Sequence, residues 1–290
     1  MSDSYKATVL ITGGTDGLGK AAAALLAERG YRVFAAGRSA EKRAQLDALA
    51  REKNLPLASL EMDVNRDESV RNAVQSVLAS GAAIDVLINN AGIGYMAAVE
   101  DLKLDDLRQQ FETNVFAVVR VTQAVLPHMR ERRKGRILMM SSVAGLVTPP
   151  TYGAYSSSKH ALEGLSNALR LELHPFGIRV VLIEPGYIVT NFQQTAKDLA
   201  APYVAAAAAG PYAKIYAGAW AGANQGRSGS KTTPADCARV IVRTIEATNP
   251  KARYGVTPLA RLVKFGKRFM SDGMMDAFLR RKYGISKPER

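Results

Sequence analysis

Short apolar runs alternate along most of the chain with longer stretches in which apolar residues recur every three or four positions. The short runs have the length and β-branched content of buried strands, and the longer stretches have the spacing of helices that cover a sheet. Predicted strands span residues 8–11, 32–36, 57–64, 86–89, 136–141 and 179–184. Repetition of strand, helix and strand requires right-handed crossovers and a parallel sheet with helices on both faces. We therefore predict a single-domain α/β fold of the Rossmann type, that is, a doubly wound parallel sheet.

The alternation weakens after residue 187. Residues 187–231 are rich in Ala, Gly, Pro and Ser with weak helical signals, and they fit either a mobile lid or an irregular surface insertion. Beyond Thr233 and Pro234 a helix is predicted to about residue 247, followed by a short strand at 254–256 and basic helices. We expect a catalytic domain over residues 1–258, with a substrate loop at about 187–231, and a basic helical C-terminal extension over 259–290.

The first predicted strand runs into a glycine-rich turn, residues 12–19, that opens a helix predicted at residues 20–29. Glycines let the backbone approach a pyrophosphate, whose charge is met by free N–H groups at the helix N-terminus. Predicted cofactor contacts in this turn are Gly13, Thr15, Asp16, Gly17, Leu18 and Gly19. The turn also fits the phosphate loop of nucleoside triphosphatases as far as Lys20, but Ala21 stands where that loop needs Ser or Thr to hold magnesium.

A tyrosine and a lysine lie four residues apart, at Tyr155 and Lys159, in the helix predicted after the fifth strand. That spacing places them on one helical face. Free tyrosine titrates near 10, so a fixed cation at about 4.5 Å would lower its pKa by about two to three units, toward working pH. Ser142 supplies a hydroxyl at the end of the fifth strand. This arrangement predicts a group that exchanges a proton with a substrate.

Taken in chain order, these motifs resemble the short-chain dehydrogenase/reductase family, and the resemblance runs from about Lys6 to Thr190, with looser similarity to about Tyr254. The matching pieces are TGxxxGxG at residues 12–19, NNAG at 89–92, the helical asparagine at Asn114, the active-site serine at Ser142, YxxxK at Tyr155 and Lys159, and the PG segment at 185–190. The resemblance implies an enzyme that moves a hydride between a nicotinamide cofactor and a carbonyl or alcohol carbon.

By the same resemblance, Tyr155 is the general acid in reduction and the general base in oxidation, while Lys159 lowers its pKa and holds the nicotinamide ribose. Ser142 donates a hydrogen bond to the substrate oxygen, and Asn114 anchors a water that links Lys159 to bulk solvent. Further cofactor contacts implied by the resemblance are Asp63, Val64, Asn90, Ala91, Gly92, Pro185, Gly186, Ile188 and Thr190, beside Tyr155 and Lys159.

The second predicted strand ends without the acidic residue that NAD-specific sites use to accept the ribose hydroxyls. Gly37 stands where that acid is expected, and Arg38 and Ser39 follow it. A guanidinium there suits a 2′-phosphate, which nothing at this strand end repels. We therefore predict NADP(H) as the cofactor, although Asp16 stands in the glycine loop where NADP-preferring relatives often carry a basic residue.

Substrate choice is expected to depend on aromatic side chains after the PG segment. Predicted substrate contacts are Ser142, Tyr155, Met96, Tyr187 and Phe192. Side chains available to line an apolar pocket for a steroid, a retinoid or a fatty ketone are Met96, Tyr187, Phe192, Tyr203, Tyr212 and Trp220, for each of which ordinary packing is the commoner role. This region loosely resembles family members related to 17β-hydroxysteroid and retinol dehydrogenases.

Composition narrows the setting of the protein. Hydrophobic residues make up 47% of the chain and charged residues 22%, as in an ordinary globular protein with a substantial core. The sequence shows no signal peptide or membrane-spanning run, and Cys237 is its only cysteine, so we expect a cytoplasmic protein with a buried, inert thiol. His128, His160 and His174 lack metal-ligand spacing, and no metal is predicted.

Most of the net charge of +13 lies at the C-terminus, where residues 251–290 hold eleven Lys or Arg and three acidic residues. Apolar and basic residues alternate there at the spacing of an amphipathic helix: Leu262, Val263, Phe265, Phe269 and Met270 among Arg261, Lys264, Lys267 and Arg268. The segment fits a solvated helix face, a peripheral contact with an anionic membrane, or a cap on the substrate pocket. Because the body is only mildly basic, nucleic acid is a disfavoured partner.

The resemblance also implies a homodimer or homotetramer that pairs through the helices at about residues 111–133 and 155–173. Two other classes of function stay open: a redox sensor that binds NADP(H) to control a partner, and a nucleic-acid-binding module that uses the basic tail. Turnover of a carbonyl compound separates an enzyme from a sensor, and a steep salt dependence of affinity marks nucleic-acid binding.

Overall fold

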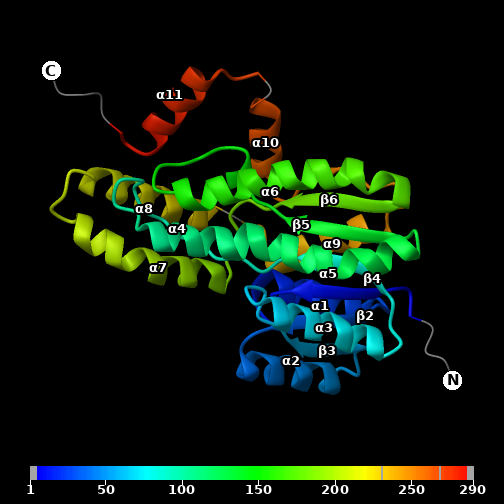
Figure 1. The fold of residues 1–290 in the computed structure, drawn as a ribbon. Helices are drawn as coiled ribbons and strands as arrows, with labels where there is room; N and C mark the ends of the chain where they lie inside the picture. Colours follow the sequence, from blue (N-terminus) through cyan, green and yellow to red (C-terminus); the bar gives the residue numbers. More distant parts are fainter. Residues whose placement is uncertain (1–4, 230, 268, 286–290) are drawn as a thin grey trace.

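A seven-stranded parallel sheet in the order β3-β2-β1-β4-β5-β6-β7 forms the centre of the fold (Figure 1). The computed structural model describes residues 5–229, 231–267 and 269–285, without the side chains of 222–229. The strands are β1 (Thr8–Thr12), β2 (Arg32–Gly37), β3 (Leu57–Glu61), β4 (Ile84–Asn89), β5 (Gly135–Met140), β6 (Ile178–Glu184) and β7 (Arg253–Gly255). The predicted doubly wound fold is confirmed, and its strand order switches direction between β1 and β4, where such sheets bind ligands.

Helices cover both faces of the sheet. On one face lie α1 (Gly17–Glu28), α2 (Ala40–Glu52) and α9 (Pro234–Glu246), and on the other lie α3 (Asp67–Ala79), α5 (Ala117–Glu131) and α6 (Gly153–Glu172). Cys237 of α9 is fully buried in the first of these two cores. The predicted burial of this thiol is confirmed, and burial raises its pKa to about 12, which disfavours the reactive thiolate.

The third strand is shorter than predicted, because a turn begins directly after it. Asp63 accepts a hydrogen bond from the Asn65 N–H at 3.1 Å, and its own N–H donates to Ser69 Oγ at 2.9 Å. These side-chain bonds replace ladder bonds, so β3 ends at Glu61 and the predicted continuation to Val64 is wrong.

The segment predicted to be irregular contains two long helices, α7 (Asn191–Ala207) and α8 (Ala213–Gly229). Thr190 and Gln193 form a capping box that starts α7, and the following alanines favour a helix. In Figure 1 the pair projects from the end of the sheet where the strands terminate. The weak apolar periodicity hid these helices, although the capping box was present in the sequence.

The C-terminal extension is helical, as expected, with α10 (Pro258–Gly266) and α11 (Asp272–Lys282). Figure 1 shows both standing off the body, above α6. We call residues 258–285 the C-terminal arm. Arg268, one of the basic residues of the predicted amphipathic helix, and residues 286–290 lie outside the described residues.

No helix in the described ranges combines the length and the apolar character needed to cross a bilayer.

Candidate active site

The segments that follow β1, β4, β5 and β6 meet at the carboxyl edge of the sheet. The Thr12 hydroxyl at the end of β1 accepts hydrogen bonds from the backbone N–H groups of Asn90 and Ala91, at 3.0 and 3.1 Å. The Val143 N–H after β5 donates to the carbonyl of Pro185 after β6, at 2.8 Å. The predicted motifs, far apart in the sequence, therefore share one edge.

The glycine loop is held by Asn90. Its side-chain amide donates to the carbonyls of Thr12 and Gly13, both at 3.0 Å. Gly13 has φ +60°, a left-handed conformation that favours glycine, and a Cβ on Gly19 would meet the Gly13 carbonyl at 2.2 Å. Asn90 thus braces the loop with its side chain, and its contact with the cofactor stays a prediction.

Asp16 begins α1 and joins the glycine loop to two other elements. Its carboxylate accepts hydrogen bonds from the Gly17 N–H at 2.7 Å, from Lys42 Nζ at 2.5 Å, and from the Asn191 amide at 3.0 Å. Burial opposes ionisation of Asp16, yet these donors together hold its pKa below the usual range. Lys42 and Asn191 were not predicted as site residues. Asp16 was expected to reduce the positive charge beside the glycine loop, and Lys42 offsets that reduction.

The end of β2 leaves space for the glycine loop. A Cβ on Gly37 would lie 2.3 Å from Thr15 Oγ1, so Gly37 is required by packing as well as by charge. Arg38 is exposed and makes no ion pair within the described residues, while Arg43 donates to its carbonyl at 2.8 Å. Ser39 Oγ caps α2 by accepting from the Lys42 N–H. The Arg38 guanidinium is therefore available to an anionic ligand.

The PG segment packs against the glycine loop from the other side. A Cβ on Gly17 would lie 3.5 Å from Thr190 Cβ, and Ile188 is buried beneath the segment. A Cβ on Gly186 would lie 2.2 Å from Thr257 Oγ1, so this glycine admits the residue that begins the C-terminal arm. Asp63 and Val64 lie in the turn after β3, and their contact with the cofactor stays a prediction.

Ser142, Tyr155 and Lys159 are brought together, as predicted. Ser142 lies close enough to the Tyr155 hydroxyl for its side chain to favour the ionised phenol and so to lower its pKa. Lys159 Nζ lies 5.7 Å from the centroid of the Tyr155 ring and donates to the Met140 carbonyl at 2.7 Å. Only 5% of Lys159 is exposed. The η1 π-helical turn (Glu112–Phe116), which directly precedes α5, lies beside it.

The predicted direction of the Tyr155 pKa shift is wrong for this arrangement. Burial raises the pKa of Tyr155 to about 12, against the opposing effect of the Ser142 side chain. Burial also lowers the pKa of Lys159 to about 8, partly offset by the charge of Glu163. The prediction assumed a cation near the phenol oxygen, whereas the ammonium is bonded to a strand carbonyl. Tyr155 is accordingly protonated throughout the physiological range.

Asn114 lies in the π-helical turn between α4 (Leu104–Phe111) and α5 and is fully buried. Its amide oxygen accepts from the Ile93 N–H at 2.9 Å, and its amide nitrogen donates to the Ile93 carbonyl at 3.0 Å and to Ser158 Oγ at 3.1 Å. A Cβ on Gly92 would lie 3.2 Å from Asn114 Oδ1 and 3.9 Å from Lys159 Nζ. Asn114 therefore fixes the loop after β4 beside Lys159. The wide π-helical turn, which sequence periodicity does not reveal, places it there.

A buried ionic network that was not predicted lies on the same helix as Lys159 and links it to β6 and β7. Ser141 Oγ donates to Glu163 Oε1 at 2.5 Å, and Arg253 of β7 pairs with both Glu163 and Glu184. Lys264 of the C-terminal arm lies 3.6 Å from the fully buried Glu184 carboxylate. The network thus links the catalytic helix, the strand before the PG segment and the arm.

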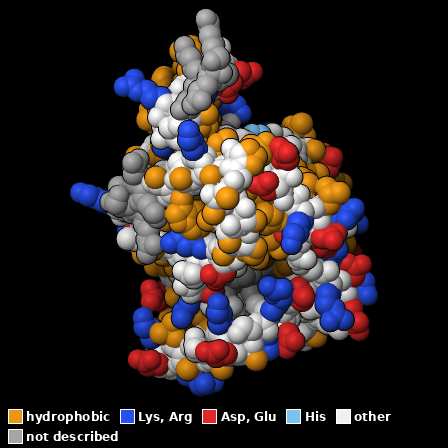
Figure 2. Space-filling view, turned by 90° about the vertical axis from the view of Figure 1, so that its left-hand side faces the viewer, with side chains coloured by type: hydrophobic (Ala, Val, Ile, Leu, Met, Phe, Trp, Pro, Cys, Tyr) orange, Lys and Arg blue, Asp and Glu red, His pale blue; other side chains and the backbone are white. Residues whose placement is uncertain are grey.

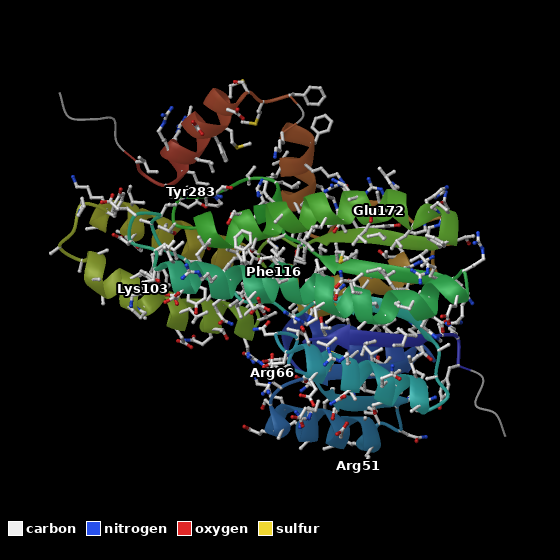
Figure 3. All side chains as sticks on the ribbon, in the orientation of Figure 1. Arg51, Arg66, Lys103, Phe116, Glu172 and Tyr283 are labelled. Atoms are coloured by element: carbon white, nitrogen blue, oxygen red, sulfur yellow. The ribbon has the colours of Figure 1, made fainter. Side chains whose placement is uncertain are left out.

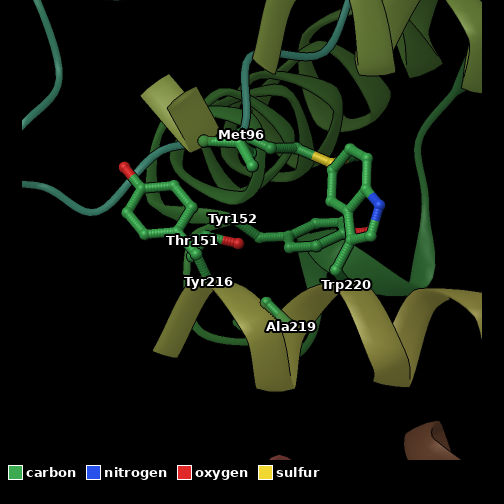
Figure 4. Close-up of a pocket in the computed structure, with 7 residues that line it drawn as sticks. Met96, Thr151, Tyr152, Tyr216, Ala219 and Trp220 are labelled. Atoms are coloured by element: carbon green, nitrogen blue, oxygen red, sulfur yellow. The ribbon is translucent and has the colours of Figure 1, made fainter. Parts of the chain in front are cut away.

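The candidate substrate side is apolar. Phe192, at the start of α7, contacts the Tyr155 ring at a centroid distance of 5.6 Å. A cavity of about 10 Å³ nearby is lined by Met96, Thr151, Tyr152, Val204, Tyr216, Ala219 and Trp220, and Figure 4 shows the Met96 and Trp220 side chains meeting across it. Tyr187, Tyr203 and Tyr212 do not line this cavity, whereas Met96 and Trp220 do. Tyr152 and Tyr216 line it without having been predicted.

These residues fit a nicotinamide dinucleotide. The glycines of the loop leave room for a pyrophosphate, and the N-terminus of α1 faces that space. The Arg38 guanidinium, unpaired within the described residues, follows β2.

Known proteins share both the sequence and the architecture. Residues 7–200 match the family model described as short chain dehydrogenase. A 3-ketodihydrosphingosine reductase from Bacteroides thetaiotaomicron is 34% identical over 287 residues, 96% of this chain and 98% of that one. An NADPH-dependent 3-dehydrocapnine reductase from Ornithobacterium rhinotracheale is 33% identical over 92% of this chain and 94% of that one. The crystal structure of a short-chain dehydrogenase from Streptomyces avermitilis matches with a TM-score of 0.77 and 30% identity, covering 99% and 100% of the two chains.

Proposed function

Because the chain belongs to the short-chain dehydrogenase/reductase family, we propose that it is an NADPH-dependent reductase that converts a long-chain ketone to the corresponding alcohol. The observation that carries the proposal is the meeting of Ser142, Tyr155 and Lys159 beyond the strand ends, with the ring of Phe192 packed against that of Tyr155. Tyr155 can give a proton to a carbonyl oxygen in reduction or take one from an alcohol in oxidation. Reduction is proposed because two relatives that match nearly the whole chain are reductases.

In the proposed reaction Tyr155 gives its proton to the carbonyl oxygen as negative charge develops there. Ser142 donates a hydrogen bond to the same oxygen and stabilises that charge. When bound, NADPH supplies the hydride that reaches the carbonyl carbon. The Lys159 ammonium, fixed by the Met140 carbonyl, provides a positive field beneath the ring of Tyr155 and a donor for the ribose. Asn114 holds the loop after β4 in a fixed position beside Lys159 and Tyr155.

The choice of NADPH over NADH rests on Arg38. It is exposed, follows the strand end at which an NAD-specific acid would stand, and has no carboxylate partner in the described ranges. A charge-assisted, bidentate bond from its guanidinium to a 2′-phosphate would favour the phosphorylated cofactor. Lys42, although paired with Asp16, adds a second positive charge at this side of the loop.

The proposed substrate class follows from the two reductases that match nearly the whole chain. Dihydrosphingosine is a long-chain amino alcohol, and the reductase named for it acts on a 3-keto compound. The aromatic and methionine side chains of the small cavity suit an alkyl chain better than a polar metabolite. Since that cavity holds about 10 Å³, admission of a chain requires α7 and α8 to move outward.

Three tyrosine hydroxyls would resist that movement, because they tie α7 and α8 to the segment after β4. The pairs are Tyr203 with Asp106, Tyr212 with Glu100, and Tyr216 with Asp101. We infer that α7 and α8 form the lid of the substrate site, held shut by these three bonds.

The assembly is proposed to be a homodimer or homotetramer that pairs through α5 and α6. Phe116, before α5, is 55% exposed, and Leu171 on α6 is 72% exposed, so these faces carry unpartnered apolar surface. Figure 3 shows Phe116 on the face of the molecule that α5 and α6 form. A monomeric mass by light scattering at micromolar concentration contradicts this assembly. The cytoplasmic location stays a prediction from the sequence.

Steady-state assay of the purified full chain tests the function. With NADPH and 3-ketodihydrosphingosine in mixed micelles, we expect NADPH consumption and the alcohol product by mass spectrometry. A short polar ketone at the same concentration should give a much lower kcat/KM. NADPH binding with no turnover of long-chain, steroid or short ketones would instead indicate a redox sensor, and preference for the short ketone would refute the substrate class.

A further inference from the structure

We propose that the C-terminal arm docks the protein on an anionic membrane surface, through an outward apolar group at α10 and the basic residues beside it. The apolar group consists of Leu262 and Phe265 on α10 and Phe269 just beyond its end, which are 67%, 68% and 67% exposed. The rings of Phe265 and Phe269 pack against each other at 5.1 Å, and Leu259 extends the group toward the helix start. Isolated apolar residues are common on protein surfaces, but a contiguous exposed group marks an interaction site.

The arm is held to the body by the opposite side of α10. Ala260 is fully buried, Thr257 Oγ1 caps the helix by accepting from its N–H at 3.1 Å, and Lys264 reaches the buried Glu184. Arg261 Nε donates to the Gly255 carbonyl at 3.2 Å. These contacts fix the rotation of α10 about its axis. Leu262 and Phe265 therefore face away from the protein.

Positive charge surrounds the same helix. Arg261 and Lys267 of the arm are exposed, and residues 251–290 carry a net charge of +8. Arg261 also lines a surface groove of about 580 Å³ along α1 and α9, in which Arg29, Arg239, Arg243 and Lys231 outnumber Asp236 and Glu246. Arg261 is one helical turn before Phe265, so the basic groove adjoins the apolar group. Figure 2 shows the arm rising from the body with basic and hydrophobic side chains at its surface.

This combination favours a lipid surface over a second copy of the chain. A second copy would bring its own net positive charge against the arm, whereas an anionic bilayer complements it. Burial of one exposed Leu or Phe side chain raises a partition coefficient by roughly tenfold or more, and each basic residue near an anionic surface adds about fivefold. Three apolar and several basic side chains are therefore enough for reversible peripheral binding.

Docking would also place the lid at the membrane. Tyr283 at the end of the arm packs on α8, where a Cβ on Gly218 would meet the Tyr283 carbonyl at 2.2 Å. Ala219 and Trp220, the next residues of α8, line the apolar cavity, and Figure 3 shows Tyr283 above that end of the molecule. This consequence rests on the proposed lipid substrate; the docking itself does not.

Vesicle sedimentation with the full chain tests the docking directly and needs no activity. We expect wild-type protein to sediment with vesicles of phosphatidylcholine and phosphatidylserine, to stay in solution with phosphatidylcholine alone, and to be released by high salt. Leu262→Ser with Phe265→Ser should lower the partition coefficient by roughly tenfold or more. The matched control is Leu104→Ser, which removes an apolar side chain that is 65% exposed at the start of α4 and should change nothing.

Charge reversal provides an independent arm of the test. Arg261→Glu with Lys267→Glu should abolish binding, while Arg51→Glu with Arg71→Glu, on α2 and α3, should leave it nearly unchanged; Figure 3 shows Arg51 at the opposite end of the molecule from the arm. Thermal melting confirms that each variant folds. The proposal is overturned if wild-type protein fails to bind the acidic vesicles, or if both arm variants bind as well as wild type. Dissociation of an oligomer by Leu262→Ser with Phe265→Ser, without vesicle binding by wild type, would identify a second copy as the occupant.

Discussion

The catalytic edge of the sheet and the region beyond Thr190 are built in opposite ways. At the edge, buried polar groups such as Asn114 and Lys159 each have defined hydrogen-bond partners, mostly backbone carbonyls and N–H groups of neighbouring loops. Beyond Thr190, the helices α7 and α8 are tied down by tyrosine hydroxyls and surround an apolar cavity, and the arm exposes its apolar side chains.

The difference separates chemistry from recognition. Backbone-anchored polar groups hold the reacting atoms in place whatever the substrate, because they depend on strand ends that the sheet fixes. Helices held by a few side-chain bonds are able to move and to change their lining, as admission of a large apolar molecule requires. Substitutions at the edge of the sheet should therefore change kcat and cofactor choice. Substitutions beyond Thr190 should change the stability of the lid and the KM for the substrate.

The largest effect is expected at the proton donor. Tyr155→Phe keeps the ring and its contact with Phe192 but removes the proton, so kcat should fall about 10²- to 10⁴-fold. Fluorescence titration should show NADPH affinity within about twofold of wild type, because the glycine loop and Arg38 are untouched. Tyr254→Phe serves as control, because within the described residues this hydroxyl bonds to the Lys251 N–H alone. Residual activity within tenfold of wild type contradicts the role of Tyr155.

Cofactor choice should respond next most strongly. Arg38→Ala should lower kcat/KM for NADPH roughly ten- to a hundredfold, since a bond to a charged group is worth about 1.5–3 kcal/mol, and leave that for NADH nearly unchanged. Replacing Gly37 by Asp is a poorer test, because its Cβ would collide with Thr15. Arg51→Ala, at the far end of α2, is the control. A higher kcat/KM for NADH than for NADPH in wild type would show that Arg38 does not select the cofactor.

The pH profile of reduction should report Lys159 before Tyr155. The pKa of Lys159 is depressed to about 8, so its ammonium is present below that pH and is lost as pH rises through it. The pKa of Tyr155 is raised to about 12, so its proton stays in place over the same range. We expect kcat/KM for reduction to decline above about pH 8, and Lys159→Arg, if active, to move the decline to higher pH. A profile that is flat to pH 10 would contradict the assignment to Lys159.

The smallest effect is expected in the lid. Tyr216→Phe leaves the buried Ala98 N–H without its acceptor, which should cost about 1–3 kcal/mol of unfolding free energy. It also frees α8 from Asp101, so KM for a long-chain ketone should change more than kcat. Tyr212→Phe removes an exposed bond to Glu100 and should leave the thermal midpoint near that of wild type. Equal effects of the two substitutions would argue against a tightly held lid.

The same division explains what could be predicted from the sequence. The strands, the glycine loop and the Tyr155–Lys159 spacing are local patterns, and the sheet converts them into one site. The turn at Asp63 and the capping box at Thr190 were also readable, because their residue types carry the signal. Hydrophobic periodicity, on which the predicted strands and helices rest, does not contain either signal.

Other features depend on contacts that no local pattern contains. Lys42 meets Asp16 from another helix, and Arg253 meets Glu163 across 90 positions of the chain. The pKa of Tyr155 could not be predicted from spacing, because burial and the carbonyl bound by Lys159 outweigh the attraction that spacing suggests. The lid helices likewise owe their position to Tyr203 and Tyr216, whose partners lie about a hundred residues earlier.

The central claim, hydride delivery to a ketone carbon with a proton from Tyr155, is tested most directly by isotope labelling. NADPH deuterated on both faces of nicotinamide C4 is supplied to the full chain with 3-ketodihydrosphingosine, and the alcohol is analysed by mass spectrometry. We predict one deuterium on the carbinol carbon, and none there when unlabelled NADPH is used in heavy water. Two results would contradict the account. One is deuterium from heavy water on the carbinol carbon, and the other is no deuterium on that carbon after the labelled NADPH has been consumed.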